Sequence, residues 1–331
     1  MKKAIFINNK LMYYKVKDNF KTQEEKFMRK TAVLLAALGI ISGVAYAEQP
    51  ELKVKSVGQF IQVDNTSGNE DIGEKVHFGN KVSLSYGKDW SFGLMARKSW
   101  QADTDDGIHS KGHRLDLDAW KKMGDNFSIG ARWRQEAKYD RYYLRTKYSY
   151  GMFSGDFDMA YQSNNSEAGR KSGDRDGYYF EGTPISVKLG PATVGYYFKT
   201  ETPIAAGSDF DKAGIDHWYR HQLRVGMPVY QGEKLNIGVQ YGWEFANDIE
   251  ISGKDADNHY TLKHDNNSHI LWLTASYQAT ENLTFTGSYE YDMFNWEKEG
   301  NGTQYAKSSS KSSKDSDKYY GELQIGWTYK F

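Results

Sequence analysis

The 331-residue chain contains 25 Tyr, 9 Trp and 16 Phe but no Cys, a composition that fits passage through an oxidising compartment. Its 43 basic and 43 acidic side chains balance, and without residues 1–47 the chain carries a formal charge of −6, which argues against a nucleic-acid-binding protein. After Ala47 no apolar run approaches the roughly 18 residues that a membrane helix needs, so a helical membrane protein is excluded.

The first predicted element is a secretory signal peptide. Met28-Arg29-Lys30 is followed by the apolar run 31–44, which is too short to span a bilayer, and then by Ala45-Tyr46-Ala47. A basic start, a short apolar stretch and an A-x-A site are typical of a cleaved signal. We therefore expect cleavage after Ala47, with Ala45 and Ala47 as the recognised residues. Residues 1–27 are interpreted as an upstream extension ahead of a true start at Met28, and an extended signal or cytoplasmic anchor is the alternative.

The rest of the chain alternates between apolar and polar residues in about fourteen segments. In the segment 235–246, for example, every second residue from Leu235 to Phe245 is apolar. Such alternation is expected of strands that face lipid on one side and water on the other. The sequence therefore predicts an all-β fold, a transmembrane antiparallel barrel of about 14 strands, with 12 or 16 as alternatives. The predicted strands are 51–63, 75–86, 90–101, 113–123, 127–139, 142–150, 156–162, 177–189, 192–203, 217–229, 235–246, 268–278, 283–296 and 318–331.

Short and long connections take turns along the chain. Tight turns such as Gly87-Lys88-Asp89 and Gly190-Pro191 alternate with polar loops such as 163–176 and 247–267. This is the outer-membrane pattern of short periplasmic turns and long external loops, and an even strand count places both ends on the periplasmic side.

Three places break the pattern. The first segment changes phase near Gly58, and the connection at Asp140-Arg141 is short for an external loop. Pro184 lies inside segment 177–189, where it removes a hydrogen-bond donor and predicts a bulge or a late strand start.

The polar faces of the strands carry many charges, which we expect to line an aqueous lumen. One hypothesis is a basic wall that faces an acidic wall and so creates a transverse field. The alternative is pairing between adjacent strands, in which Asp116, Asp118 and Glu136 neutralise neighbouring arginines. The predicted basic lining residues are Arg97, Arg114, Lys122, Arg132, Arg134, Lys138, Arg145, Lys147, Arg220 and Arg224, and the acidic ones are Glu244, Glu290, Asp292 and Glu322.

The last segment ends in a free aromatic residue. Leu323, Ile325, Trp327, Tyr329 and Phe331 share one face, and polar residues occupy the other. We interpret Trp327, Tyr329 and Phe331 as the assembly signal that the outer-membrane insertion machinery recognises.

Signals for an enzyme or a metal site are weak. His217 and His221 share a strand face, as do His109 and His113, but no second shell of ligands accompanies them. No spacing indicates a nucleophile–base constellation. We expect neither an enzyme nor a cofactor.

Several stretches resemble the fusobacterial major outer-membrane porin family. They are residues 78–87, 104–110, 142–155, 190–197 and the final strand. The resemblance implies a weakly selective, water-filled channel, a homotrimer, and external loops that meet host or bacterial surface molecules. The arginine-lined strands also resemble, more distantly, porins for acidic oligosaccharides.

These features together predict a porin of the bacterial outer membrane. It would let ions and small hydrophilic solutes diffuse passively through the barrel. Two alternatives remain, a channel selective for acidic oligosaccharides and a surface adhesin that acts through its external loops. No nucleic acid is expected as a partner.

Overall fold

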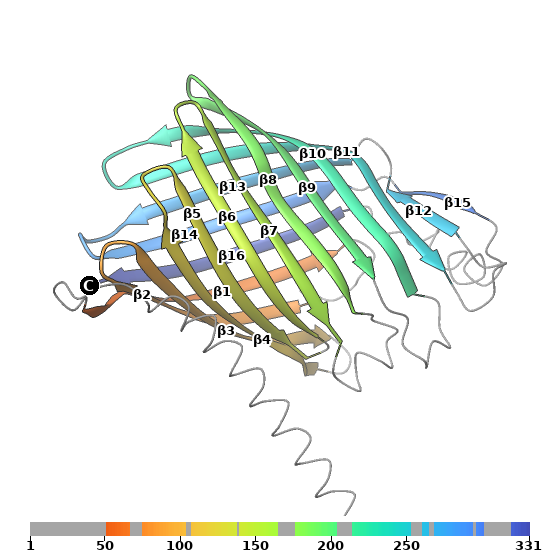
Figure 1. Ribbon diagram of the computed structural model, residues 1–331, viewed down its shortest axis with the longest axis horizontal. Coiled ribbons are helices and arrows are strands. Elements are labelled where there is room, and N and C mark those ends of the chain that lie inside the picture. Colours follow the sequence, from red (N-terminus) through yellow and green to blue (C-terminus); the bar gives the residue numbers. More distant parts are fainter. Residues whose placement is uncertain are drawn as a thin grey trace, which may run out of the picture. The chain divides into compact units, whose positions relative to one another are not determined.

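Sixteen β-strands are hydrogen-bonded into one antiparallel sheet in the described part of the computed structural model (Figure 1). The structure describes residues 51–66, 75–103, 107–137, 139–164, 176–203, 214–252, 260–264, 268–293, 296–300 and 319–331. The predicted signal peptide, with Ala45 and Ala47, lies outside the described residues, as does Lys138. In the described ranges no helix is long and apolar enough to cross a membrane.

The strands run in chain order, with bounds as follows. They are β1 (Leu52–Thr66), β2 (Lys75–Tyr86), β3 (Trp90–Asp103), β4 (Gly107–Lys122), β5 (Phe127–Glu136), β6 (Asp140–Tyr150), β7 (Phe153–Ser163), β8 (Gly177–Leu189), β9 (Ala192–Pro203), β10 (Gly214–Gln231), β11 (Leu235–Ser252), β12 (Tyr260–His264), β13 (Ser268–Gln278), β14 (Leu283–Met293), β15 (Trp296–Gly300) and β16 (Tyr319–Lys330).

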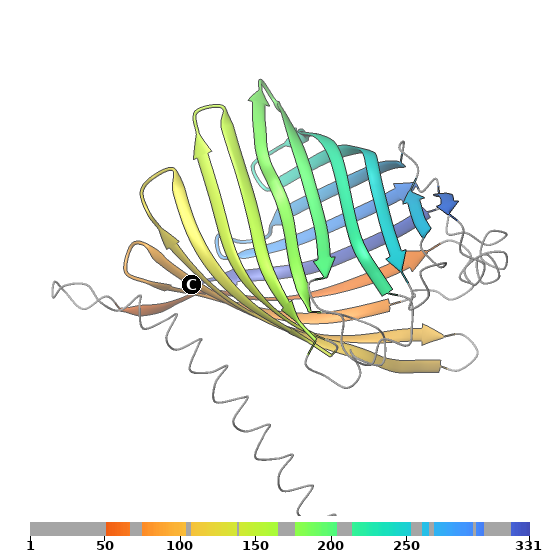
Figure 2. The same cartoon turned by 45° about the vertical axis from the view of Figure 1, so that its right-hand side comes forward.

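Fourteen of these strands close into a ring. Each pairs with its neighbours in the order β10 back to β1, then β16, β14, β13 and β11, and β11 pairs again with β10. The short strands β12 and β15 lie outside the ring, because β12 pairs only with the far end of β11 and with β15 (Figure 2). The predicted 14-strand barrel is therefore confirmed, and closure leaves none of the fourteen with an unpaired edge.

The predicted strand limits are mostly correct. Four predicted segments, 75–86, 177–189, 192–203 and 268–278, have the observed bounds of β2, β8, β9 and β13. The polar loop predicted at 247–267 is wrong in part, because β11 continues to Ser252 and β12 follows within it. The segment 283–296 likewise ends early, at Met293, before β15 begins.

Two connections on the loop side differ from the prediction. β4 begins at Gly107 rather than at residue 113, so β3 and β4 form a longer hairpin. Asp140 and Arg141 belong to β6, and the short connection lies instead at residues 137–139. The backbone nitrogen of Glu136 donates to the Tyr139 carbonyl at 2.9 Å and closes this turn.

Tight turns gather at one end of the ring. Gly87, Gly151 and Gly190 have φ values of 62°, 58° and 63°, a left-handed conformation that side chains with a Cβ disfavour. The C-terminus lies at the same end, since the Phe331 nitrogen donates to the Lys55 carbonyl at 3.1 Å. The short turns predicted from the sequence are thus present at this end of the ring, but at the opposite end the connections from β3 to β4 and from β5 to β6 are also short.

Bulges correct the phase of two strands. In β1 the register shifts between Val54 and Ser56, so the phase change falls at Lys55 and not at Gly58 as predicted. In β8 the register shifts between Gly182 and Ile185, which surrounds Pro184 and confirms the predicted bulge. The extra residues let both strands keep their apolar side chains on one face.

Polarity is inverted relative to a water-soluble protein. Large apolar side chains are exposed on thirteen of the fourteen strands of the ring, all except β9, as illustrated by Ile61 at 52% and Leu144 at 46%. The buried side chains are instead largely polar or charged, among them Asp116, Gln222 and Glu244. A closed ring with an apolar outer surface satisfies every backbone group internally, which is the condition for crossing a bilayer. The fold is a transmembrane β-barrel of the outer-membrane type.

Candidate pore lining

Two long-range ion pairs identify the interior face of the barrel. Arg141 on β6 lies 2.9 Å from Glu201 on β9, and Arg220 on β10 lies 3.9 Å from Asp292 on β14. Each pair spans two intervening strands of the ring. Side chains separated in this way converge only on the concave side, so the face that carries these residues is the interior.

The first interior network joins β4, β5 and β6. Asp116, only 2% exposed, accepts hydrogen bonds from Arg114 Nη2 at 2.8 Å and from Arg134 Nε at 3.0 Å. Asp118 accepts from Arg132 Nε at 2.8 Å and from Arg145 Nη1 at 2.6 Å. These contacts follow from register, because Asp116 is opposite Arg134 and Asp118 is opposite Arg132.

A second network surrounds Glu244 on β11. Its fully buried carboxylate accepts hydrogen bonds from Arg220 Nε and Gln222 Nε2 at 2.6 Å and from Asn247 Nδ2 at 2.7 Å. A buried carboxylate needs this degree of compensation, since leaving it unpaired would cost several kcal/mol.

Two further predicted acidic residues, Glu290 and Glu322, form a row with Asp64 across three neighbouring strands. Glu290 on β14 is opposite Glu322 on β16, which is in turn opposite Asp64 on β1. Tyr320 donates its hydroxyl to Glu322 at 3.0 Å, and His77 contacts Asp64 at 3.1 Å. Like charges directly opposite each other destabilise a sheet. Because these carboxylates lie side by side, they concentrate negative potential on one side of the interior.

Three of the predicted basic residues have no carboxylate oxygen within 4.0 Å among the residues that the structure describes: Arg97, Lys147 and Arg224. Lys122 lies 3.3 Å from Asp125 in the exposed turn after β4. Arg97, Lys147 and Arg224 therefore differ from the paired arginines of the first network, although the sequence pattern alone groups all of them together.

Pairing with a carboxylate on the same or an adjacent strand thus accounts for five of the predicted basic residues, namely Arg220, which contacts Glu244 on β11, and four arginines of β4, β5 and β6. Arg114, Arg132, Arg134 and Arg145 each contact a carboxylate on their own strand or on a neighbouring one. The acidic row lies elsewhere on the ring, on β14, β16 and β1. A transverse field between a basic and an acidic wall stays a prediction, because the paired arginines are already largely neutralised.

Several interior cations make cation–π contacts with aromatic rings. Arg145 and Lys147 lie over Trp120, with 4.8 Å and 4.4 Å to the ring centroid, and Lys199 lies over Trp218 at 4.1 Å. Lys199 was not among the residues predicted from the sequence, nor was Arg141, which lies 4.0 Å over Tyr179. The alternation along β6 and β9 contains both and could have revealed them.

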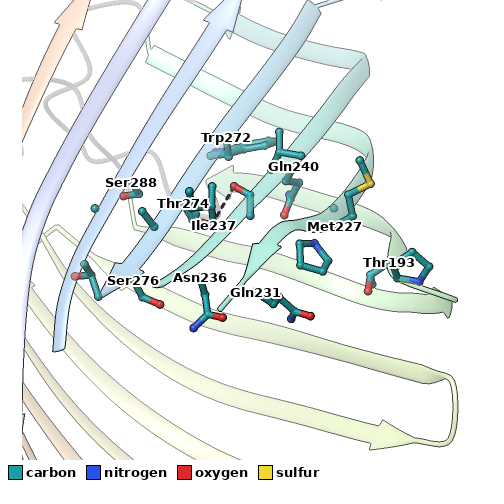
Figure 3. Close-up of a pocket in the computed structure, with 18 of the residues that line it drawn as sticks. Thr193, Met227, Gln231, Asn236, Ile237, Gln240, Trp272, Thr274, Ser276 and Ser288 are labelled. Atoms are coloured by element: carbon teal, nitrogen blue, oxygen red, sulfur yellow. Dashed lines mark hydrogen bonds between the residues drawn. The ribbon is translucent and has the colours of Figure 1, made fainter. Parts of the chain in front are cut away.

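A cavity of about 950 Å³ opens on the interior wall toward the short-turn end (Figure 3). Its lining comes from β9, β10, β11, β13, β14 and β16. Hydroxyl and amide side chains such as Thr274, Ser288 and Gln240 supply most of its polar groups. Arg224 is the only charged side chain among the described residues that line it.

The predicted assembly residues lie on the outer face at the end of the chain. Tyr329 and Phe331 are 39% and 69% exposed, and their rings form an edge contact with centroids 5.2 Å apart. Trp327 shares their phase on β16 and is opposite Gln59. Their role in assembly stays a prediction.

The histidines considered as metal ligands make other contacts. His217 lies 3.1 Å from the Thr202 hydroxyl, and His221 lies 2.7 Å from the Tyr196 hydroxyl. Among the described residues no group of three or more His, Cys, Asp or Glu side chains is arranged to hold a metal ion.

The ring, its apolar exterior and its charged interior define the class as a transmembrane β-barrel with a polar lumen. No protein-family model matches the sequence. No curated protein matches it significantly.

Solved structures with a related arrangement are outer-membrane proteins. An outer-membrane channel from Pseudomonas putida F1 has a TM-score of 0.43 at 13% identity, over 87% of this chain and 100% of that one. In-vitro folded OmpT, an outer membrane protein of Vibrio cholerae, has a TM-score of 0.42 at 11% identity, over 86% and 100%. The outer membrane protein OprD from Pseudomonas aeruginosa has a TM-score of 0.39 at 13% identity, over 87% and 96%. The fold assignment itself rests on the strand pairings described above.

Proposed function

We propose that the protein is a porin, a passive diffusion channel of the bacterial outer membrane for ions and small hydrophilic solutes. The observation that carries this proposal is the polar interior of a closed 14-strand ring. Barrels of about eight strands fill their interior with side chains, whereas larger rings leave space for water. The only cluster of buried apolar side chains among the described residues is small, consisting of Tyr143, Ala160 and Tyr179.

The interior charges support ion passage rather than a sealed core. The acidic row on β14, β16 and β1 and the first arginine network on β4, β5 and β6 lie on different parts of the wall. Fixed charges beside an aqueous path raise the local concentration of counter-ions, and salt screens the effect over about 10 Å at 0.1 M. Passive transport needs no catalytic group, and we propose that the protein is not an enzyme.

The membership of the fusobacterial porin family and the homotrimer that it implies are parts of the same proposal. Recognition of the terminal aromatic residues by the insertion machinery also belongs to it, as does contact of the external loops with host or bacterial molecules. The adhesin alternative depends on loops that lie largely outside the described residues, and no contact described here favours it.

Liposome swelling tests the proposal directly. Vesicles that contain the folded protein are diluted into isotonic solutions of uncharged sugars of increasing size. We expect swelling rates that fall steadily with solute size, as for a water-filled pore. Vesicles that carry the heat-unfolded protein provide the control. Equal rates with folded and unfolded protein would reject a diffusion channel.

A further inference from the structure

Arg224 differs from the other interior arginines in how it is held. Its guanidinium carbon lies 3.6 Å from the ring centroid of Tyr197 and 4.8 Å from that of Trp272. Its Nε donates to Gln222 Oε1 at 2.7 Å. Two rings and one amide therefore fix the position and the plane of a side chain that would otherwise be flexible.

The two terminal nitrogens of the Arg224 guanidinium, Nη1 and Nη2, make no hydrogen bond to a described residue. No carboxylate oxygen among the described residues lies within 4.0 Å of Arg224, and Nε makes its only hydrogen bond to a described residue. The neighbouring Arg220 differs, because its Nε already lies 2.6 Å from the Glu244 carboxylate. A planar guanidinium with two unused nitrogens is suited to bind a carboxylate through two parallel hydrogen bonds.

The side chains that line the cavity beside Arg224 indicate the chemistry of a ligand whose carboxylate would bind the guanidinium. At about 950 Å³ it is large enough for a molecule of several carbon atoms, and its other lining side chains are uncharged. Thr274, Thr286, Ser288 and Gln324 offer both donors and acceptors of hydrogen bonds. Such groups match the hydroxyls of a polyol, while a single cation matches a single negative charge.

We propose that the cavity is a binding site for small hydroxylated monocarboxylates, such as sugar acids, with Arg224 as the carboxylate-binding residue. The site rests on the proposed channel function and refines it, since a binding site on the lumen wall gives a passive channel a preference for one class of solute. The carboxylate lies against the guanidinium edge, and the hydroxylated body lies along β11, β13 and β14. Trp272 provides an apolar surface beside the ring or chain of the solute.

Bilayer recording with D-gluconate as the probe tests the site. In 0.1 M KCl we expect gluconate to reduce the channel current with a saturating concentration dependence, and neutral D-glucose to have a much smaller effect. Arg224→Gln should raise the half-blocking concentration at least tenfold, equivalent to about 1.4 kcal/mol. Arg224→Lys should fall in between, because an ammonium group lacks the planar fork.

Lys147→Gln is the matched control. It removes one interior positive charge that also lies over an aromatic ring, at 4.4 Å from Trp120, but outside the cavity. We expect less than a twofold change in gluconate block. Equal shifts in the Arg224→Gln and Lys147→Gln variants would show a general charge effect and overturn the site.

A second pair of variants covers the case in which Arg224→Gln does not fold. Ser288→Asp places a negative charge in the cavity and should also raise the half-blocking concentration at least tenfold, whereas Ser288→Asn should not. Failure of the site and failure of the channel are distinguishable. Conductance without saturable gluconate block rejects the site alone, and gluconate binding by calorimetry to a folded but non-conducting protein rejects the channel alone.

Discussion

Removing the carboxylate of Asp116 should destabilise the barrel strongly. Three arginines surround this side chain, with Arg114 at 2.8 Å, Arg134 at 3.0 Å and Arg132 at 3.9 Å. Asp116→Asn keeps the shape but leaves these cations without their common partner. Breaking a buried ion pair costs about 3–5 kcal/mol. Because the arginines retain some exposure to the lumen, we expect the lower end, about 3 kcal/mol, or roughly a hundredfold in the unfolding equilibrium.

Urea unfolding of the barrel in phospholipid vesicles measures this change, with tryptophan fluorescence as the signal. The midpoint should fall while the slope of the transition is unchanged, since the surface exposed on unfolding is the same. Asp125→Asn is the control, because the Asp125 side chain is 97% exposed in its pair with Lys122 and should have no measurable effect. A loss below about 1 kcal/mol in Asp116→Asn would refute the argument that this network stabilises the barrel.

The same network predicts opposite changes in ion selectivity, which the reversal potential under a KCl gradient measures. Asp116→Asn exposes uncompensated arginines and should shift selectivity toward anions. Replacing Arg132, Arg134 and Arg145 together by Gln leaves the carboxylates unpaired and should shift it toward cations. Both shifts should shrink as the salt concentration rises, because screening shortens the range of the charges. Reversal potentials that match the unmodified protein at low salt would place these residues away from the path of the ions.

Three further predictions concern processing, assembly and packing. Mass spectrometry of outer-membrane material should find Glu48 at the N-terminus, and a mature protein that retains earlier residues would contradict the predicted cleavage. Phe331→Asp should leave the protein degraded or in the periplasm, and normal heat-modifiable barrel in the membrane fraction would show that the terminal aromatic is incidental. A Cβ at Gly79 would lie 2.1 Å from the Phe60 ring, so Gly79→Ala should cost about 1–3 kcal/mol in urea unfolding. In Gly287→Ala, where the nearest atom is 4.0 Å away, we expect little change, and equal effects would reject the steric explanation.

The strands of the ring were predictable because alternation is enforced along every one of them. An arginine on the lipid face near the midplane would cost about 2–4 kcal/mol, so polarity must reverse at each residue. That constraint does not extend to β12 and β15, which lie outside the ring and are only five residues long. Alternation of polarity also does not locate a bulge to the residue. The phase change of β1 was therefore predicted near Gly58, whereas it falls at Lys55.

The interior face was predictable, but the partners on it were not. Alternation places Arg132 and Arg224 on the same kind of surface, yet Arg132 pairs with Asp118 while Arg224 contacts two aromatic rings. The difference depends on register between strands, which turns and bulges determine. In the β4–β5 hairpin, for example, the turn after Lys122 sets Asp118 opposite Arg132, and a slip by one residue would separate them.

Single-channel recording of the folded protein in a planar bilayer tests the central claim most directly. A diffusion channel should produce discrete current steps whose size rises in near proportion to the KCl concentration, with both ions carrying current. Protein that is folded by heat modifiability and inserted in the bilayer, yet gives no current steps, would contradict a water-filled lumen and with it the proposed function.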